Sequence, residues 1–297
     1  MTDQRQEPAL VQSGDVEDLV RIWNEAFGDD PEYIRNFLRL AAEPDNVVVS
    51  HEDGKAVSAA YLLENSLVVR GRSYSAYYFY AAATDPEYRG KGHMSRIIEY
   101  CIALAKERDV DFIYLVPAEG SLYHYYSKYG FRTCFYARTV NFSRKELAAA
   151  ICGEESAEPE AENPYTFALT DVPKVREEAL AGTDHVALDY KVMQYALFEH
   201  ASCGGEILCD GNSYALYNNN NGTVVITELC PPTLDGSMAR LLLQLDARKY
   251  VFHAPYVCEV EGHRKTLGRA GMAIALNKKA RTASGQMQNA YIGITLG

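Results

Sequence analysis

The sequence predicts an α/β protein in which a mixed, mainly antiparallel sheet is flanked by helices and is followed by a second, smaller domain. Two patterns predict the first domain: β-branched and aromatic residues alternate over residues 46–84, and apolar residues recur at helical spacing on either side. A third observation is that residues 206–256 partly repeat the same order of strands, helix and strand. The length of 297 residues suits about two domains of roughly 150 residues each.

Helices are expected at both ends of the strand-rich stretch. In DVEDLVRIWNEAFG, residues Val16, Leu19, Val20 and Ile22 or Trp23 share one face, and PEYIRNFLRLA continues as a second helix. The strands form a meander of three or more, because the turn signals Glu52-Asp53-Gly54 and Arg70-Gly71 interrupt the alternation. The remaining elements are a helix at 94–108, a strand at 112–118, a helix at 121–129 and a strand pair around 131–142.

The segment CGEESAEPEAENP marks a domain boundary, since it holds five glutamates, two prolines and no basic residue. The predicted domains are therefore residues 1–145, an acidic linker at 146–164, and residues 165–297. The second domain is either a degenerate duplicate of the first or a generic α+β domain. After its central strand it has CPPTLDGSM, which contains no arginine and one glycine, so we expect it to bind no second cofactor.

Composition narrows the classes of partner. A net charge of −11 argues against a nucleic-acid partner, because binding phosphate backbones normally needs a basic face. The first twenty residues have neither a basic start nor an apolar stretch, so we expect a cytoplasmic protein without a membrane partner. Seven cysteines without a CxxC pair suit a reducing compartment, with Cys101 on the apolar face of its helix, and no metal site is expected.

The turn YRGKGHMS has the features of a phosphate-binding loop. Gly90 and Gly92 allow the backbone to approach a ligand closely, and a helix starting near His93 or Met94 offers free N–H groups to an anion. Arg89 and Lys91 add positive charge. The chain lacks the GxxxxGK[ST] of a P-loop, and Ser95 stands where a Rossmann GxGxxG has its third glycine.

With YSKYGF at residues 126–131, the stretch ATDPEYRGKG resembles the signature of the GNAT superfamily of acyl-CoA-dependent N-acetyltransferases over roughly residues 8–142. The resemblance implies a GNAT-like fold in both domains and acetyl-CoA as cosubstrate. Arg89 and Gly92 match the family's pyrophosphate-binding pattern, whereas Met94 replaces its last small residue. The implied cofactor-binding residues are Ala82, Ala83, Thr84, Arg89, Gly90, Lys91, Gly92, His93, Met94 and Ser95, with the first three along the pantetheine arm.

The same resemblance implies a catalytic acid. Tyr126 occupies the position of the family's tyrosine that protonates the departing thiolate, and a phenol suits this role because it is neutral at working pH. Its neighbours Tyr123, Tyr125 and Tyr129 are alternative assignments, as is His124.

The general base is less well defined by the sequence. SAYYFYAAAT lacks the strand glutamate of many relatives, which leaves Glu64 and Glu119 as candidates. The chain also resembles the enhanced-intracellular-survival type of acetyltransferase, in which the terminal carboxylate enters the active site, and this implies Gly297 as the base.

Three functions follow as hypotheses. The first is transfer of an acetyl group from acetyl-CoA to a primary amine of a small molecule or peptide by direct attack. The second is a catalytically idle acyl-CoA-binding or sensing module, and the third is a nicotinamide-dependent oxidoreductase. The presence of Tyr126 favours the enzyme. The acceptor amine and the oligomeric state are left open, because no short motif fixes an acceptor pocket.

Overall fold

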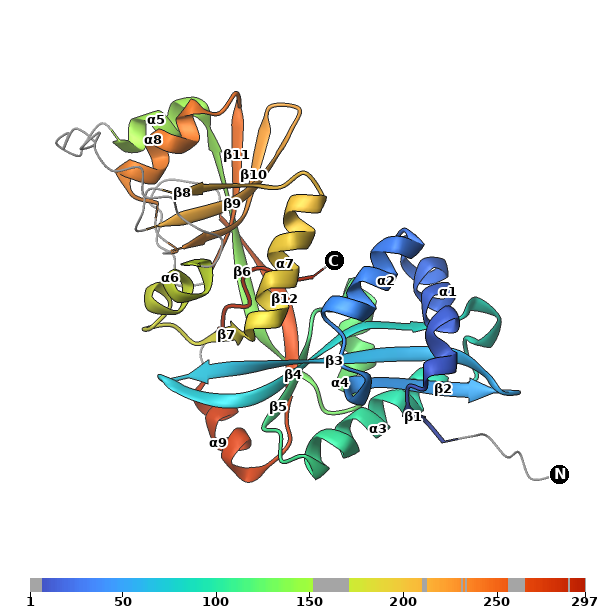
Figure 1. The fold of residues 1–297 in the computed structure, drawn as a ribbon. Helices are drawn as coiled ribbons and strands as arrows, with labels where there is room; N and C mark the ends of the chain where they lie inside the picture. Colours follow the sequence, from blue (N-terminus) through green and yellow to red (C-terminus); the bar gives the residue numbers. More distant parts are fainter. Residues whose placement is uncertain are drawn as a thin grey trace. The chain divides into compact units, whose positions relative to one another are not determined.

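The computed structural model describes residues 7–151, 171–209, 213–230, 232, 234–255, 265–287 and 289–296. The chain forms two compact units (Figure 1). Unit 1 comprises Met1–Leu67, Ser73–Thr133 and Gly271–Gln286, and unit 2 comprises Val68–Arg72, Cys134–Ala270 and Met287–Gly297.

The units interleave along the chain, and in this they differ from the ranges predicted from sequence. Residues 271–286 join unit 1 because Met272–Ala275 pair with a central strand of that unit, a long-range contact that no local pattern announces. The predicted linker is helical at its start, since residues 146–151 lie in a helix, while 152–164 lie outside the described residues. The domain boundaries themselves stay a prediction.

Unit 1 is a sheet with helices on both faces, which confirms the predicted mixed α/β class (Figure 1). Its strands are ordered β1-β2-β3-β4-β5-β12. Its elements are β1 (Ala9–Leu10), α1 (Val16–Phe27), α2 (Pro31–Leu40), β2 (Val47–Glu52), β3 (Lys55–Val69), β4 (Arg72–Thr84), α3 (His93–Glu107), β5 (Phe112–Leu115), α4 (Gly120–Ser127), the end of β12 (Lys265–Ala275) and α9 (Lys278–Gln286), with short 3-10 turns at Ser13–Asp15, Pro44–Asn46 and Pro86–Tyr88.

The two faces of this sheet have different cores. On the face of α1 and α2, the Trp23 ring lies 4.8 Å from Phe37 and 5.2 Å from Tyr61, measured between ring centroids. On the face of α3, Ile97, Ile98 and the predicted inward-facing Cys101 pack against strand residues such as Leu62 and Phe79. The predicted face of α1 is buried at Leu19, Val20, Ile22 and Trp23, whereas Val16 is 38% exposed.

The predicted meander is confirmed, with two-residue turns at Asp53-Gly54 and Arg70-Gly71. The strand predicted over 112–118 ends earlier, at Leu115. The strand pair predicted around residues 131–142 is wrong, since one strand, β6 (Arg132–Ser143), runs through the whole stretch. No turn-forming pair interrupts it, and residues Ala137–Ser143 pair continuously with β11 (Lys249–Pro255).

The strands of unit 2 include β6, β11, β10, β9 and β8, which are neighbours in that order. The core of unit 2 includes Val140, Ile226, Leu242 and Tyr250. The further elements are α5 (Arg144–Ile151), α6 (Val172–Ala179), β7 (His185–Leu188), α7 (Tyr190–Ser202), β8 (Glu206–Cys209), β9 (Tyr214–Asn220), β10 (Thr223–Cys230) and α8 (Gly236–Gln244).

The predicted repeat of strands, helix and strand is present in unit 2. The β8–β9–β10 meander is antiparallel, α8 follows it, and β11 then pairs parallel to β10. In the described part of the chain, no helix has the length and apolar character that crossing a membrane requires.

Candidate active site

The site begins where two parallel strands of unit 1 separate. β4 pairs with β5 only over Ala76–Tyr78 and Phe112–Tyr114, although β4 continues to Thr84. Ala81 has a φ of 44°, which is unusual for a residue with a Cβ and marks an irregularity in β4 just beyond the last pair. We call the opening between these strands the first fork. It leaves the edge of Ala82–Thr84 without a β5 partner.

The predicted phosphate turn closes the end of this fork. Gly90 and Gly92 have φ values of 77° and 85°, in the left-handed region that favours glycine. Gly92 is the N-cap of α3, no side chain caps that end, and the first bonded helical N–H is that of Arg96 to the Gly92 carbonyl. The N–H groups of His93, Met94 and Ser95 therefore remain for a ligand.

Arg89 in the turn and Arg96 in α3 each donate to a backbone carbonyl. Arg89 is exposed, and its Nε donates to the Thr84 carbonyl at 3.1 Å, which ties the turn to the end of β4. Arg96 donates to the Lys91 carbonyl at 3.4 Å.

Two of the predicted cofactor-binding side chains are engaged with β2 instead. Lys91 Nζ lies 3.2 Å from Glu52, and His93 Nε2 lies 2.8 Å from the other oxygen of the same carboxylate. Because Arg96 can only donate to His93 Nδ1, at 2.9 Å, the Nε2–H donates to Glu52. These contacts, with the His93 hydrogen bond first, lower the pKa of Glu52. His93 therefore offers a ligand its backbone N–H only.

A cleft of about 860 Å³ occupies the first fork. All predicted cofactor-binding residues except Lys91 line it, together with Tyr126. The full described lining is Ala26, Phe27, Ala82, Ala83, Thr84, Tyr88, Arg89, Gly90, Gly92, His93, Met94, Ser95, Ala118, Glu119, Leu122, Tyr125 and Tyr126. Residues from β4, the turn, α3 and α4 are thus brought to one concave surface.

Tyr126 lies on α4 and is 8% exposed. Its ring contacts Phe79 and Phe131 edge-on, at centroid distances of 6.2 and 5.9 Å. Burial, with a smaller contribution from Tyr129, raises the pKa of Tyr126 to about 12. The phenol is therefore protonated over the whole neutral range.

Of the neighbouring tyrosines on α4 and just after it, one lines the cleft and the others support it. Tyr129 donates to Ser95 Oγ at 2.7 Å and lies 3.5 Å from the Tyr125 hydroxyl, so it connects α4 to the first turn of α3. Tyr125 lines the cleft, and burial raises its pKa well above the usual value. Tyr123 is buried in the core and does not appear in the described lining.

The candidate bases are placed differently. Glu119 lines the cleft and accepts a hydrogen bond from Ser121 at 2.6 Å. Glu64 accepts from Asn46 at 3.1 Å and is not among the described lining residues. Gly297 lies outside the described residues, so its role stays a prediction.

Several lining residues were missed by the sequence analysis. Phe27 ends α1, is 48% exposed and lies at the cleft with Ala26. The available sequence signal was an aromatic residue at the end of the predicted helix and outside its apolar face. Tyr88 lies within the motif YRGKGHMS but had no predicted role, and the centroid of its ring lies 4.4 Å from Lys91 Nζ.

Comparison with known proteins relates part of the chain to a protein family. A family model described as an acetyltransferase (GNAT) domain matches residues 7–134. No curated protein matches the chain.

Solved structures resemble the chain over more than nine-tenths of its length. A GCN5-related N-acetyltransferase from Kribbella flavida is 15% identical, with 92% of this chain and 72% of that chain covered and a TM-score of 0.69. Eis1 from Mycobacterium abscessus is 14% identical, with 94% of this chain and 75% of that chain covered and a TM-score of 0.71. A GCN5-related N-acetyltransferase from Anabaena variabilis is 13% identical, with 91% of this chain and 73% of that chain covered and a TM-score of 0.67.

At such identities the likeness is one of fold, and it confirms the GNAT-like architecture predicted for the chain. The similarity to Eis1 agrees with the predicted resemblance to the enhanced-intracellular-survival type. Residues 7–134 are therefore similar to the acetyltransferase (GNAT) domain that this family model describes, and the chain has a GNAT-like fold.

Proposed function

We propose that unit 1 transfers an acetyl group from acetyl-CoA to a primary amine of a small molecule or peptide. The observation that carries this proposal is the first fork, where an unpaired strand edge, a turn with two left-handed glycines and an uncapped helix N-terminus line one cleft. An extended acyl-CoA has matching parts, namely an amide-containing arm and a pyrophosphate.

The residues fit acetyl-CoA on steric and electrostatic grounds. Nothing lies within 4 Å of a Cβ built on Gly90, and Gly92 meets only the end of the Arg96 side chain at 3.3 Å, so the turn is open above its backbone. The free N–H groups of His93, Met94 and Ser95 would hold the pyrophosphate, with Arg89 nearby. Ala82, Ala83 and Thr84 have small side chains, which permit an arm to lie along the strand.

In the proposed reaction, the neutral amine nitrogen attacks the thioester carbonyl carbon, a C–N bond forms and the C–S bond breaks. Tyr126 gives its proton to the departing sulfur, which suits a phenol that is fully protonated at neutral pH. A base takes the proton that the amine loses. We assign this role to the Gly297 carboxylate, with Glu119 as the alternative because it lines the cleft.

The test is a Tyr126→Phe variant with Tyr129→Phe as its matched control. We expect turnover to fall about 100-fold or more for Tyr126→Phe, because general acid catalysis typically contributes that much, while coenzyme A affinity changes little. A loss of affinity without a loss of turnover at saturation would contradict the assignment.

Further measurements separate the remaining hypotheses. Extending the chain beyond Gly297 should abolish turnover if its carboxylate is the base, whereas Glu119→Gln should do so if Glu119 is. Coenzyme A binding by a wild-type protein that acetylates nothing in a broad amine panel would favour the sensing module. Thermal stabilisation by NAD and not by acetyl-CoA would favour the oxidoreductase.

A further inference from the structure

Unit 2 contains a second fork whose backbone is built like that of the first. β10 pairs with β11 only over Thr223–Ile226 and Lys249–Phe252. Beyond these pairs β10 continues to Cys230 against β9, and β11 continues to Pro255 against β6. Two parallel strands thus separate after a short ladder, as β4 and β5 do in unit 1, where the ladder ends at Tyr78 of β4.

The central strand of each fork has an irregularity beyond the ladder. The register of β10 against β9 shifts between Ile226 and Glu228, so Thr227 is an extra residue in β10 at the opening of the second fork. In unit 1, Ala81 has its positive φ after the ladder has ended at Tyr78. A bulge bends a strand and redirects its side chains, so β10 changes course where the second fork opens.

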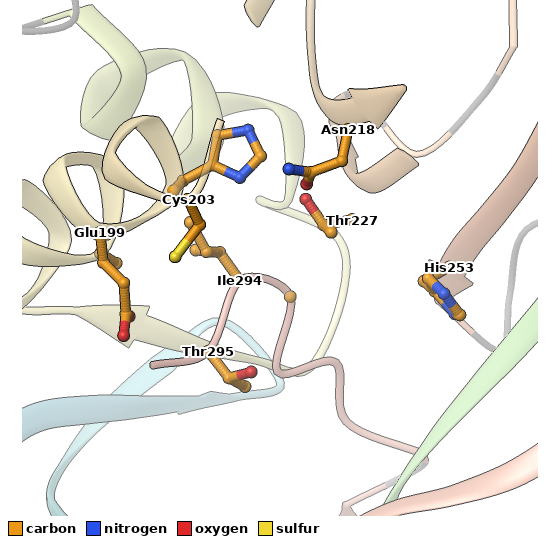
Figure 2. Close-up of a pocket in the computed structure, with 10 residues that line it drawn as sticks. Glu199, Cys203, Asn218, Thr227, His253, Ile294 and Thr295 are labelled. Carbon is orange, nitrogen blue, oxygen red and sulfur yellow. The ribbon is translucent and has the colours of Figure 1, made fainter. Parts of the chain in front are cut away.

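A cavity of about 390 Å³ lies at the second fork. Its described lining comes from α7, from β9, β10 and β11, and from the segment Gly293–Thr295 near the end of the chain. Figure 2 shows Asn218, Thr227 and His253, one from each of these strands. The described lining includes no residue of α8, the helix that follows this fork, so the cavity is formed without the helix start.

The helices that follow the two forks begin differently. In the second fork, Asp235 is the N-cap of α8, and its carboxylate accepts from the Met238 N–H at 2.8 Å. In the first fork, the N-cap of α3 is Gly92, which has no side chain, and His93, Met94 and Ser95 line the cleft. The first fork therefore presents uncapped helical N–H groups to its cleft, and the second does not.

The start of α3 is anchored from the side. A capping side chain stabilises a helix but takes up one of its free N–H groups. α3 has no such cap, and the side chain of its first residue, His93, is 3% exposed. β2 lies beside α3, and two of its side chains, Ser50 and Glu52, contact the His93 ring. These contacts hold the helix start and leave its N–H groups free.

Both ring nitrogens of His93 have partners. The Nε2–H donates to the Glu52 carboxylate at 2.8 Å, and Nδ1 accepts from the Arg96 guanidinium at 2.9 Å. The Ser50 hydroxyl lies 2.9 Å from the same Nδ1 atom and is fully buried. Because an ionised carboxylate only accepts and a guanidinium only donates, these contacts fit one tautomer and one orientation of a neutral ring. We call Ser50, Glu52, His93 and Arg96 the His93 clamp.

Arg96 extends the His93 clamp to the turn itself. Its Nη1 donates to the Lys91 carbonyl at 3.4 Å, while its Nη2 donates to the His93 ring. The guanidinium also lies against Gly92, since a Cβ built there would be 3.3 Å from Nη1. One side chain of α3 therefore contacts the residues on both sides of Gly92, and this fixes the turn relative to the helix.

The order Ser50–His93–Glu52 is that of a catalytic triad, but the His93 clamp lacks the properties of one. A nucleophilic serine must reach its substrate, whereas Ser50 is 0% exposed and is absent from the described lining of the cleft. A histidine base also needs a free lone pair, and Arg96 donates to the Nδ1 atom that faces Ser50. The contacts therefore suit a positioning role.

We propose that His93 is a positioning residue for the pyrophosphate of acyl-CoA, and that its clamp sets the affinity of the turn for that group. The clamp holds the first turn of α3 against β2, so that the N–H groups of His93, Met94 and Ser95 keep one direction. It replaces an N-cap side chain, which would use one of these groups as Asp235 does in α8. This proposal rests on the proposed function of unit 1, because it concerns the same cofactor site.

The charge of Glu52 separates this role from a purely electrostatic one. If Glu52 acted only through its charge, removing it would strengthen the binding of an anionic cofactor. Breaking the clamp should weaken binding, because the His93 ring loses the acceptor that holds it. The two roles thus predict opposite signs for the same substitution.

The experiment is a calorimetric titration of the full chain with coenzyme A. Glu52→Ala should weaken binding about tenfold, because a hydrogen bond to a charged group typically contributes that much. Glu52→Gln retains an accepting oxygen for His93 and should recover most of this loss. The matched control Glu87→Ala removes an exposed carboxylate just before the turn, outside the clamp and the described lining, and should bind coenzyme A at least as tightly as the wild type.

A second variant leaves the charge unchanged and decides the question if Glu52→Ala fails to fold. His93→Phe keeps a neutral ring and removes its hydrogen bonds, so coenzyme A binding should again weaken about tenfold. Nitrogen-15 NMR of the His93 ring gives an independent readout. Wild type and Glu52→Gln should show a protonated Nε2 and an unprotonated Nδ1, and Glu52→Ala should lose this fixed tautomer.

The outcomes distinguish this proposal from the proposed function. Coenzyme A binding by Glu52→Ala or His93→Phe that equals or exceeds that of the wild type would overturn the positioning role and leave the proposed function intact. A wild type that binds no coenzyme A would contradict the proposed function, and the positioning role with it.

Discussion

The two forks share a backbone plan and differ in the charge at their ends. In the first fork, α3 begins at Gly92 without a side-chain cap, beside Arg89. In the second fork, Asp235 is the N-cap of α8, and its carboxylate accepts from the Met238 N–H. One arrangement of strands thus leads to a helix without a side-chain cap in unit 1 and to a helix with a carboxylate cap in unit 2. A few residues after the central strand decide between them.

Each fork also has an arginine from a helix paired with an acid of its central strand or the residue after it. Arg21 of α1 pairs with Asp85, which follows β4, and the Arg21 side chain is 25% exposed. Arg176 of α6 pairs with Glu228 of β10 at 3.0 Å, and both side chains are 0% exposed. The second pair is completely dehydrated, so each of its charges depends on the other far more strongly.

The Arg176–Glu228 pair also fixes the C-terminal segment. Arg176 donates to the Val186 and Ile292 carbonyls at 2.7 and 2.9 Å, and the Tyr214 hydroxyl donates to Glu228 at 3.1 Å. Gly293 lies directly on the pair, since a Cβ there would meet Glu228 at 2.1 Å. The segment that leads to Gly297 is therefore held by buried charges.

The largest predicted effect comes from breaking this pair. Glu228→Leu should lower the free energy of unfolding by about 3–5 kcal/mol, because it removes the fully buried counter-charge of Arg176 and leaves only the half-exposed Glu177 carboxylate at 3.3 Å. Arg21→Met, the matched change in unit 1, should cost less, about 1–3 kcal/mol, because the Arg21 side chain is 25% exposed and Asp85 still accepts from the Glu87 N–H. Urea unfolding of both variants measures the difference.

The double variant Arg176→Met/Glu228→Leu distinguishes charge from packing. Removing both charges should recover much of the loss, since a buried ion pair is often no more stabilising than apolar residues of similar volume. A double variant as unstable as Glu228→Leu would show that the network of carbonyl contacts, and not the unpaired charge, dominates.

The second prediction compares two left-handed glycines. Gly92 has a φ of 85° at the first fork, and Gly222 has a φ of 79° in the hairpin turn between β9 and β10. An alanine at either position meets a backbone penalty of about 1–2 kcal/mol. For Gly92→Ala this strain opposes the conformation that we propose for cofactor binding, so acetyl-CoA affinity should fall about tenfold.

Gly222→Ala is the control for that measurement, because it introduces the same strain outside the proposed cofactor site. Calorimetric titration should give an acetyl-CoA affinity equal to that of the wild type. Equal affinities for all three proteins would remove the turn from the binding site.

The third prediction concerns the cap that distinguishes the second fork. Asp235→Ala should lower the free energy of unfolding by about 1 kcal/mol, because the Met238 N–H loses its acceptor. Asp235→Asn retains an accepting oxygen and should cost less. Thermal unfolding compares the two, and identical losses would indicate that the carboxylate charge, and not the hydrogen bond, stabilises α8.

Much of the first fork was predictable because its signals are local. Gly90, Gly92 and the helix start at His93 follow from backbone chemistry within eight residues, and period-two alternation announced the strands on either side. The second fork carried weaker signals, because a bulge such as Thr227 leaves no mark in the pattern of apolar residues. Its lining combines α7, three strands and the chain end, which no local pattern brings together.

Side-chain partners were the least predictable part of the first fork. The sequence suggested Lys91 and His93 as ligands of an anion, yet both are engaged by Glu52, about forty residues earlier in the chain. Their pairing depends on the position of β2 beside α3, which is a property of the sheet order. Likewise, residues 271–286 belong to unit 1 although they lie far along the chain from the rest of it. Asp111 helps to hold them there, because it accepts from Asn277 and Lys279 at 2.9 Å each.

The smallest predicted effect tests whether Glu52 organises the start of α3 through its contacts with Lys91 and His93. In the second fork, the carboxylate at the start of the helix is that of the N-cap residue, Asp235. The folded state lowers the pKa of Glu52 below the usual 4.5, through hydrogen bonds from His93 and then Lys91. Its contribution is therefore present above that pH and is lost as the pH falls through the lowered value.

Glu52→Gln keeps an acceptor for His93 and removes only the charge. The urea midpoint of this variant should lie slightly below that of the wild type at pH 7, and the difference should disappear as the pH falls through the lowered pKa of Glu52. A difference that persists at low pH would assign the effect to packing, and the charge at the start of α3 would then come from the turn alone.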